Sequence, residues 1–460
     1  MKKINYIYIS AFAAAISLSA CNKALNIKPK EQIDQTNAIV TSNDVQSTLV
    51  GAYNRMAQTG VYGGRIFVQP DLMAATDTVL TFNGTYQGLT QITNQAIPND
   101  NSFVLDTWQQ AYQAINLANN VVANLSKADA GQRDRMEGEA KFIRGLIYFD
   151  LARLYGRAWN DGDPATNLAV PIVLTPTTGV DNSIFVPRNT VKEVYTQAIN
   201  DLKTAEAKLP ATNSFYANSG AASAILARLY LQQGDYTNAG AEANTVIASG
   251  TFTLNAKYSD EFPIPGKASH VDNTPEDIFA IQVTEQQGIT SMNEFYASAS
   301  NSGRGDIHID PAFIAEFDAN DTRGQFYTPK LNSDNSVSFY RTKKFDNTFG
   351  NVHVVRLAEM YLIRAESNLQ TGKALGATPL SDINKIRERA GANDLTTVAL
   401  SDIKAERRHE LAFEGGFFLH DAKRLGLPVG KLQYSSPKLV FPIPLREIQA
   451  NSKLVQNPGY

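Results

Sequence analysis

Cysteine is almost absent from this chain of 460 residues, which contains a single one, Cys21. One cysteine excludes an internal disulfide, so burial alone must stabilise the core. A chain of this length can do so, because a large domain buries roughly 75% of its unfolded surface. After the first twenty residues, no apolar run approaches the ~20 consecutive residues that a membrane-spanning helix needs. The formal net charge is −3, and no basic stripe is present, which argues against nucleic acid as a partner.

The position of Cys21 indicates a lipoprotein. Two lysines precede a short apolar stretch that ends in Leu18-Ser19-Ala20-Cys21. A basic segment, an apolar segment and small residues before a cleavage point are typical of an export signal that is removed. A cysteine directly after the cleavage point can be acylated, which tethers the protein to a membrane. We predict a signal peptide over 1–20, a lipid on Cys21 and an extended leader over 21–36; the alternative is a buried free cysteine.

Helical periodicity dominates the remainder, which we treat as one domain over 37–460. The pattern is clearest over 221–249, where the turn Gln233-Gly234-Asp235-Tyr236 joins two segments rich in small residues. Small residues let helices pack closely, and this spacing is similar to the tetratricopeptide pattern. Other segments with helical spacing are 42–56, 108–122, 134–155, 191–209 and 356–389. The sequence predicts a mainly α fold, namely a degenerate tetratricopeptide-like helical-repeat scaffold with little β structure.

Two long segments, about 59–101 and 251–354, lose the helical period. They are rich in Gly, Asn, Ser and Thr, with aromatic residues at intervals. We expect both to be large irregular loop insertions, and such insertions on a rigid scaffold are where binding residues tend to lie. The tail from Pro428 onward is also expected to be irregular, because it contains four further prolines.

Four blocks of sequence resemble those of the SusD/RagB outer-membrane lipoproteins. They are GEAKFIRGLIYFDLARLYG (138–156), the repeat unit over 221–254, VVRLAEMYLIRAESNLQTGKA (354–374) with DINKIRERAG (382–391), and IKAERRHELAFEGGFFLHDAKRLG (403–426) with the terminal FPIPLREIQANSKLVQNPGY. The resemblance covers essentially the whole chain. It implies a non-enzymatic surface lipoprotein without a cofactor or metal, anchored by lipid in the cell outer membrane and facing outward. It also implies that the protein binds a nutrient, most often a glycan, and delivers it to a TonB-dependent, SusC-like transporter.

Within this family the ligand is contacted from the loop after the first helix and from the large insertion between repeat units. Carried over by region, the candidates are Tyr62, Arg65, Phe82, Asn83, Tyr86, Asn94, Asn293, Phe295, Tyr296, Asn301 and Arg304. Aromatic planes suit the face of a sugar ring, whereas amides and guanidinium groups suit its hydroxyl rim. Each aromatic residue can instead belong to the core of its loop. The two tryptophans lie outside both regions, which leaves a peptide as the alternative ligand.

Motifs for catalysis are incomplete. The string His409-Glu410-Leu411-Ala412-Phe413 begins like a zinc-protease helix, but phenylalanine stands where the second ligand is needed. The run from Asp318 to Arg323 begins like a calcium loop and lacks the required glycine and glutamate positions; the resemblance assigns it to a family turn, Asp-x-x-Asp-x-Arg. We predict no catalytic residue and no metal site, with a lipid-anchored glycoside hydrolase as the alternative.

Charged residues are unusually dense near the end of the last repeat unit. An unpaired buried charge costs several kcal/mol, so charges within an otherwise apolar helix are usually paired. We predict a structural ion network, with a contact to ligand or partner as the alternative. Its expected members are Arg387, Arg389, Arg407, Arg408, Glu410 and Glu414.

Overall fold

The computed structural model describes residues 39–75, 79–177, 179, 184–266 and 268–460. Cys21, the signal peptide over 1–20 and the leader over 21–36 lie outside the described residues. Within the described ranges, no helix combines the length and the apolar character needed to cross a membrane.

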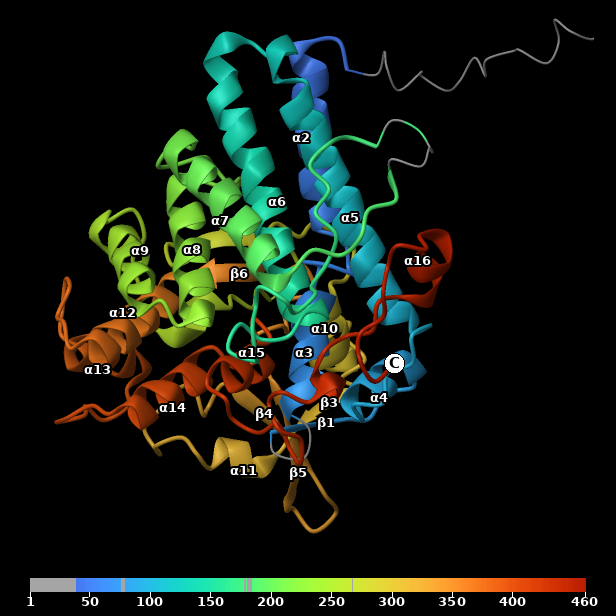
Figure 1. Ribbon diagram of the computed structural model, residues 1–460. Helices are drawn as coiled ribbons and strands as arrows, with labels where there is room; N and C mark the ends of the chain where they lie inside the picture. Colours follow the sequence, from blue (N-terminus) through green and yellow to red (C-terminus); the bar gives the residue numbers. More distant parts are fainter. Residues whose placement is uncertain (1–38, 76–78, 178, 180–183, 267) are drawn as a thin grey trace, which may run out of the picture.

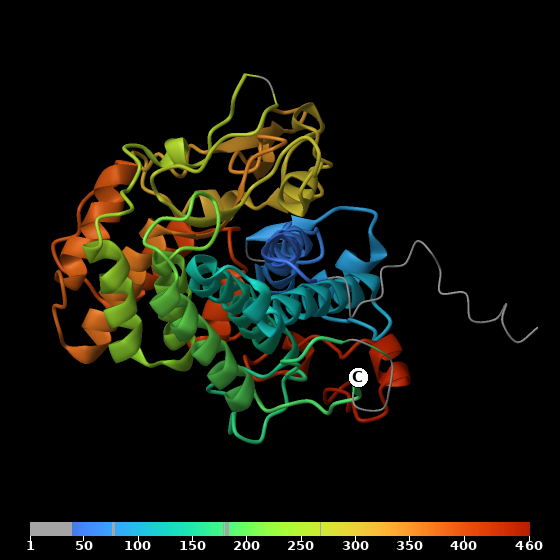
Figure 2. The ribbon, with the colours of Figure 1, turned by 90° about the horizontal axis from the view of Figure 1, so that it is seen from above.

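Antiparallel helices stacked side by side form the scaffold (Figures 1 and 2). Each helix packs on the next along the chain, from α5 through α6, α7, α8 and α9 to α12 and α13, while α2 lies against α5. Their bounds are α2 Ser42–Met56, α5 Ser102–Ala123, α6 Arg133–Tyr155, α7 Val191–Lys208, α8 Ser219–Gln233, α9 Tyr236–Ala248, α12 Leu357–Thr371 and α13 Pro379–Ala390. The predicted mainly α, helical-repeat fold is confirmed.

The turn between α8 and α9 shows how the sequence sets this packing. Gly234 ends α8 in the left-handed conformation with φ 74°, which glycine adopts without a side-chain penalty. Asp235 then caps α9 by accepting a hydrogen bond from the Asn238 backbone N–H at 3.1 Å. Further along α9, a Cβ on Gly240 would lie 2.9 Å from the Cβ of Ser367 on α12. Small residues therefore set the close approach of α9 and α12.

The expectation that 59–101 is mostly loop is wrong. This segment contains α3 (Arg65–Ala75), β1 (Leu80–Phe82) and α4 (Gln87–Thr93). Helix α3 lies in the interior and is buried almost all round, so its sequence carries no polar stripe to reveal a helix, and Pro70 stands inside it. The tail from Pro428 is irregular except for a 3₁₀ turn and α16 (Leu445–Ala450).

The second insertion is ordered into short strands and helices. It contains β2 (Asp277–Ile281), α10 (Ser291–Tyr296), β3 (Ile307–Ile309), α11 (Pro311–Ile314), β4 (Tyr327–Leu331), β5 (Val337–Thr342) and β6 (Val352–Arg356). Strands β2 and β6 pair with each other, and the other strands form an antiparallel sheet in the order β1-β3-β5-β4. Because β1 comes from the first insertion and β3 from the second, this sheet joins the two predicted ligand regions.

Two helices complete the lower part of the molecule, α14 (Leu400–Glu410) and α15 (Phe417–Arg424) (Figure 1). Helix α15 packs on α3, and α14 packs on α12. Helix α15 thereby joins the end of the last repeat unit to the first insertion.

Candidate functional site

Tyr86 forms the centre of an exposed surface at the junction of the two insertions. Its ring is 37% exposed and makes edge contacts with the rings of Phe103 and Phe295, at centroid distances of 5.6 and 5.8 Å. The guanidinium of Arg304 lies 4.7 Å from the Tyr86 ring centroid, and the Tyr86 hydroxyl donates to Glu294 Oε1 at 3.2 Å. These contacts hold the ring in place, and part of the ring remains accessible to solvent.

Arg304 is itself fixed by partners from both insertions. Its Nε donates to Asp306 Oδ2 at 2.7 Å and its Nη2 to Thr85 Oγ1 at 2.9 Å. Close by, the Asn83 N–H donates to the Asp306 carbonyl at 2.7 Å. The guanidinium of Arg304 and the carboxylate of Glu294 thus lie beside Tyr86 at positions that their hydrogen bonds fix.

A second aromatic pair stands on the outer face of the sheet. His308 on β3 stacks on Phe339 of β5 with a centroid distance of 3.5 Å and an interplanar angle of 3°, and the Arg341 guanidinium lies 4.8 Å from the Phe339 centroid. Partial burial, together with the charge of Arg341, lowers the pKa of His308. A Cβ on Gly305, whose φ is 63°, would lie 2.5 Å from Arg341 Nε, so this glycine lets Arg341 lie beside the loop of Arg304. We call Tyr86, Arg304, His308, Phe339 and Arg341 the Tyr86 platform.

The sequence did not single out His308, Phe339 or Arg341. Their proximity depends on the pairing of β3 with β5, whose registered pair is Ile309 with Tyr340. The available signal was the short alternation over 337–341, which indicates a strand and does not identify its partner.

The structure brings Phe82, Asn83 and Arg304 together around Asp306, with Arg304 against Tyr86, and it leaves other candidates apart. Arg65 lies behind Phe103, with its guanidinium 4.4 Å from that ring and 2.7 Å from Asp106 Oδ2. Asn94 is exposed at the far end of α4. The backbone carbonyl of Asn301 accepts a hydrogen bond from Asn293 Nδ2 at 3.1 Å.

Four of the predicted ligand contacts are contradicted, because the side chains of Tyr62, Asn293, Phe295 and Tyr296 are buried. The Tyr62 hydroxyl donates to Asp150 Oδ2 at 2.5 Å, and Asn293 Nδ2 donates to the Phe345 carbonyl at 2.7 Å. Tyr296 packs between Phe345 and Phe413. Phe295 supports Tyr86 from below. These residues shape the insertions from inside and present no surface to a ligand.

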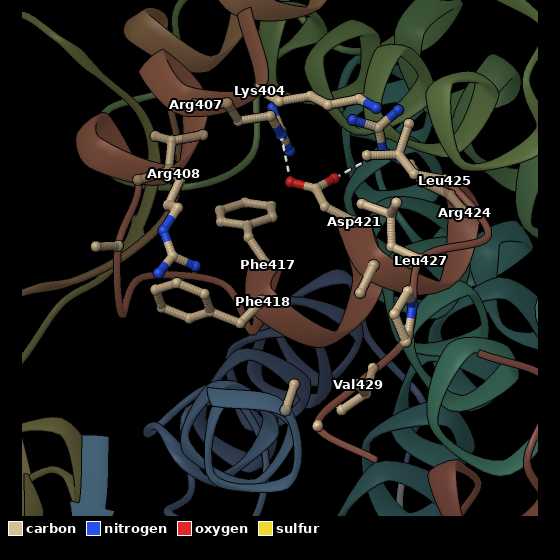
Figure 3. A pocket seen from close by; sticks show the side chains of 16 residues that line it. Lys404, Arg407, Arg408, Phe417, Phe418, Asp421, Arg424, Leu425, Leu427 and Val429 are labelled. Atoms are coloured by element: carbon tan, nitrogen blue, oxygen red, sulfur yellow. Dashed lines mark hydrogen bonds and ion pairs between the residues drawn. The ribbon is translucent and has the colours of Figure 1, made fainter. Parts of the chain in front are cut away.

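A cavity of about 260 Å³ lies where α14 and α15 meet the segment 427–430 (Figure 3). Its apolar lining includes Phe417, Phe418, Leu425, Leu427 and Val429, and its cationic lining consists of Lys404, Arg407, Arg408 and Arg424. Arg407 and Arg424 both bind Asp421 at 2.7 Å, and Arg408 binds Glu316. Much of the positive charge is neutralised internally, so the cavity suits a small apolar group better than the hydroxyl rim of a sugar.

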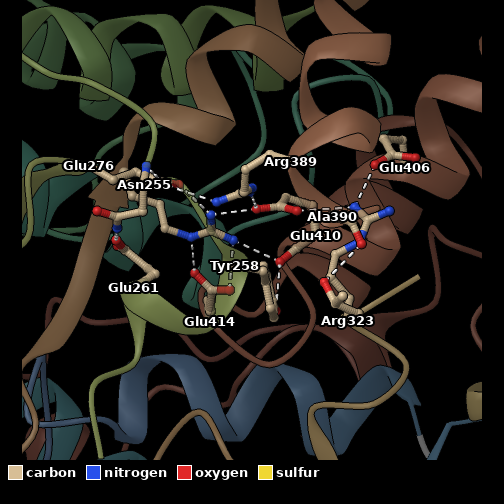
Figure 4. A network of polar contacts seen from close by, with 12 residues as sticks. Asn255, Tyr258, Glu261, Glu276, Arg323, Arg389, Ala390, Glu406, Glu410 and Glu414 are labelled. Carbon is tan, nitrogen blue, oxygen red and sulfur yellow. Dashed lines mark hydrogen bonds and ion pairs between the residues drawn. The ribbon is translucent and has the colours of Figure 1, made fainter. Parts of the chain in front are cut away.

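A buried ion network links Arg389 of α13 with Glu406 and Glu410 of α14 (Figure 4), and Arg323 of the second insertion binds both glutamates. Glu410 accepts from Arg323 at 3.0 Å, from Arg356 at 2.6 Å and from Arg389, and Arg356 also binds Glu414 at 2.6 Å. Burial acts to raise the pKa of Glu410, but the three guanidinium groups outweigh it and hold that pKa well below its usual range. Arg323 is the arginine of the Asp-x-x-Asp-x-Arg turn, and Asp321 of the same turn binds it at 2.7 Å.

The predicted structural network is confirmed for Arg387, Arg389, Glu410 and Glu414. Arg387 reaches Glu406 at 3.0 Å, and Glu406 in turn binds Arg323. Two assignments need correction. Arg408 pairs with the exposed Glu316, and Arg407 belongs to a neighbouring cluster, where it binds Glu359 at 3.1 Å. Successive positions on one helix point to different partners, which helical spacing alone does not reveal.

Comparisons with known proteins agree with this architecture. A family model described as "Starch-binding associating with outer membrane" matches residues 25–231, and one described as "SusD family" matches residues 298–436. The chain is 26% identical to SusD-like protein P2 of Formosa agariphila over 91% of this chain and 93% of that protein.

Two solved structures share the fold over nearly their whole length. A SusD superfamily protein of Bacteroides thetaiotaomicron is 25% identical with a TM-score of 0.81, covering 91% of this chain and 100% of that one. A protein of Bacteroides vulgatus, described as a candidate sugar binding protein, is 26% identical with a TM-score of 0.79, covering 92% and 99%. On the matches to both halves, the full-length relative and the shared fold, this chain belongs to the SusD/RagB family.

Proposed function

We propose that the protein captures a nutrient oligosaccharide non-covalently at the Tyr86 platform and delivers it to a partner TonB-dependent transporter of the SusC type. In this proposal the lipid on Cys21 tethers the protein to the outward face of the outer membrane. The starch-binding description of the family model and the sugar-binding description of the Bacteroides vulgatus relative support a carbohydrate ligand.

The observation that carries the proposal is a pre-positioned aromatic surface with hydrogen-bonding groups around it. A sugar presents a C–H face that packs on an aromatic ring and a rim of hydroxyls that needs fixed donors and acceptors. The partly exposed Tyr86 ring and the stacked His308 and Phe339 rings supply the aromatic surface for the C–H face. Arg304 and Glu294 supply the hydrogen-bonding groups, and the contacts of Arg304 with the buried Asp306 and of Glu294 with Tyr86 fix them before ligand arrives.

Replacing Tyr86 or Arg304 with alanine tests this assignment. Loss of a central tyrosine or arginine contact typically costs about 1–2 kcal/mol or more, which is roughly a 5- to 30-fold weaker affinity. Isothermal titration against a panel of oligosaccharides and peptides measures it. Phe215→Ala, which removes an aromatic ring that is 48% exposed outside both insertions, is the matched control and should leave the affinity unchanged.

The same panel separates the alternatives. If peptides bind and glycans do not, the ligand is a peptide. Reducing ends released from polysaccharide would favour a lipid-anchored hydrolase, although on the platform Asp306 is already paired with Arg304. If no ligand binds even with the co-purified transporter, the capture role is wrong.

A further inference from the structure

Three side chains from separate segments converge at the edge of the ion network. They are Glu261 at the end of a 3₁₀ turn (Tyr258–Glu261), Asp277 at the start of β2 and His353 on β6. His353 Nδ1 lies 2.6 Å from Asp277 Oδ1 and 3.4 Å from Glu261 Oε1, and the three atoms lie within 4.8 Å of one another. Glu261 is fully buried and the other two nearly so.

Surrounding groups fix the orientation of both carboxylates. Glu261 Oε2 accepts from Asn255 Nδ2 and from Thr274 Oγ1, both at 2.6 Å, and Asp277 Oδ2 accepts from the Thr274 backbone N–H at 2.8 Å (Figure 4 shows Glu261 and Asn255). The opposite oxygens are thereby turned toward His353. Glu261 Oε1 is buried without a hydrogen-bond partner.

The strand pairing itself contributes to this arrangement. The register between β2 and β6 shifts twice, between Asp277 and Phe279 and again between Phe279 and Ala280. Such irregularities re-aim side chains next to functional sites. Here the shifts accompany the approach of Asp277 to His353, whose registered partner is Ala280.

Neighbouring cations are committed elsewhere. Arg356 binds Glu276, Glu410 and Glu414; Arg389 binds Glu276 and Glu410; and Lys344 donates to Glu414 and to the carbonyls of Glu410 and Ala412. Among the described residues, Glu261 and Asp277 therefore contact only one basic side chain, that of His353. Buried charges in proteins are paired or coordinate metals, and these two buried carboxylates face a single imidazole.

We propose that Glu261, Asp277 and His353 form a binding site for a divalent transition-metal ion of the Zn²⁺ class. One imidazole nitrogen with two carboxylate oxygens suits Zn²⁺ and its neighbours, whereas Ca²⁺ takes six to eight oxygen ligands and Mg²⁺ usually keeps several waters. Donor groups held by a surrounding shell of hydrogen bonds, as Asn255 and Thr274 hold Glu261, are the usual setting of such ions.

The distances fit this class of ion. Two ligands at ~2.0–2.1 Å from a tetrahedral ion lie about 3.3 Å apart, close to the 3.4 Å between Glu261 Oε1 and His353 Nδ1. The 2.6 Å contact of His353 with Asp277 is a hydrogen bond. A bound ion would replace this bond, and the distance between the two atoms would need to increase by less than ~1 Å. A cavity of about 20 Å³ adjoins all three residues, enough for one water as a further ligand.

The ion would tie the 3₁₀ turn to the β2–β6 pair and so stabilise the base of the second insertion. This role is independent of the ligand at the Tyr86 platform. Protein without a histidine tag, stripped with a chelator, should bind one equivalent of ZnCl₂ in calorimetry and show a concentration-dependent rise in Tm. Addition of Co²⁺ should give the visible absorption of a four- or five-coordinate ion.

Two near-isosteric variants, His353→Gln and Asp277→Asn, should each weaken Zn²⁺ binding by at least ~10-fold. His270→Ala is the control, because His270 lies 3.8 Å from the exposed Asp272, which lines the same cavity; it should leave the affinity unchanged. Absence of Zn²⁺ binding and of a Co²⁺ spectrum in the wild-type protein would overturn the site, as would binding that requires His270 and not His353. The Co²⁺ spectrum of the wild-type protein tests the site even where a variant fails to fold.

Discussion

Replacing Arg356 with methionine should lower the free energy of unfolding by about 3–5 kcal/mol, the usual cost of removing one partner from a buried ion pair. Arg356 is 1% exposed and donates to Glu276 at 2.7 Å and to Glu410 and Glu414 at 2.6 Å. Methionine fills part of the volume but leaves three carboxylates short of a cation. Urea denaturation at pH 7 measures the loss.

The pH dependence gives a second readout of the same substitution. Although burial opposes it, Arg356 and the neighbouring cations hold the pKa values of Glu410 and Glu414 below their ordinary range. A carboxylate with a lowered folded-state pKa contributes stability that is complete above the unfolded value of about 4.3 and is lost as the pH falls toward the folded value. The difference in the free energy of unfolding between wild type and Arg356→Met should therefore become smaller as the pH falls below about 4.

Arg408→Met is the matched control. Arg408 forms two contacts with Glu316, at 2.9 and 3.0 Å, but both side chains are about one-third exposed. Exposed pairs contribute about 0–1 kcal/mol to stability. The free energy of unfolding of this variant should therefore differ from that of wild type by no more than about 1 kcal/mol at every pH. A loss of less than ~1 kcal/mol for Arg356→Met would contradict the network as a stabilising element.

The scaffold could be predicted from the sequence because its helices carry their own signals. The unit over 221–249 combines an apolar period with Gly234 at its turn, and both appear in the structure as expected. Helix α3 could not be predicted in this way. It is enclosed by other elements, so no polar face marks its period, and Pro70 argues locally against a helix that tertiary packing nevertheless stabilises.

The candidate site could be predicted by region and not by residue. Tyr86 and Tyr296 have the same side chain and both lie in predicted ligand regions, yet one is 37% exposed and the other is fully buried. That difference arises from long-range packing. The same holds for Asp277 and His353, which are 76 positions apart and meet only because β2 pairs with β6.

The terminal block QNPGY illustrates how a family motif acquires a physical meaning. Gln456 exchanges two hydrogen bonds of 2.7 Å with the backbone of Ile443. Asn457 donates to the carbonyls of Tyr155 and Phe441, at 2.9 and 2.7 Å. The chain end is thus fastened to the end of α6, and Arg188 completes this attachment.

Arg188 is 7% exposed and bonds to acceptors from three parts of the chain. It donates to the carbonyls of Ala169, Leu168 and Tyr155, and to the tail through the Val455 carbonyl at 2.9 Å and Asn457 Oδ1 at 2.7 Å. Burial lowers its pKa to about 10, so it remains charged at neutral pH. Hydrogen bonds to a charged group contribute about 1.5–3 kcal/mol each and are not additive.

Arg188→Met should therefore cost about 3 kcal/mol or more and release the tail. Lys453 is exposed just before the attached segment, so limited digestion with trypsin should remove residues 454–460 much faster from the variant, as mass spectrometry would show. Arg446→Met, on the exposed face of α16, is the control and should change stability by no more than about 0.5 kcal/mol. Equal rates of cleavage in wild type and Arg188→Met would mean that packing of Leu454 and Tyr460, and not Arg188, holds the chain end.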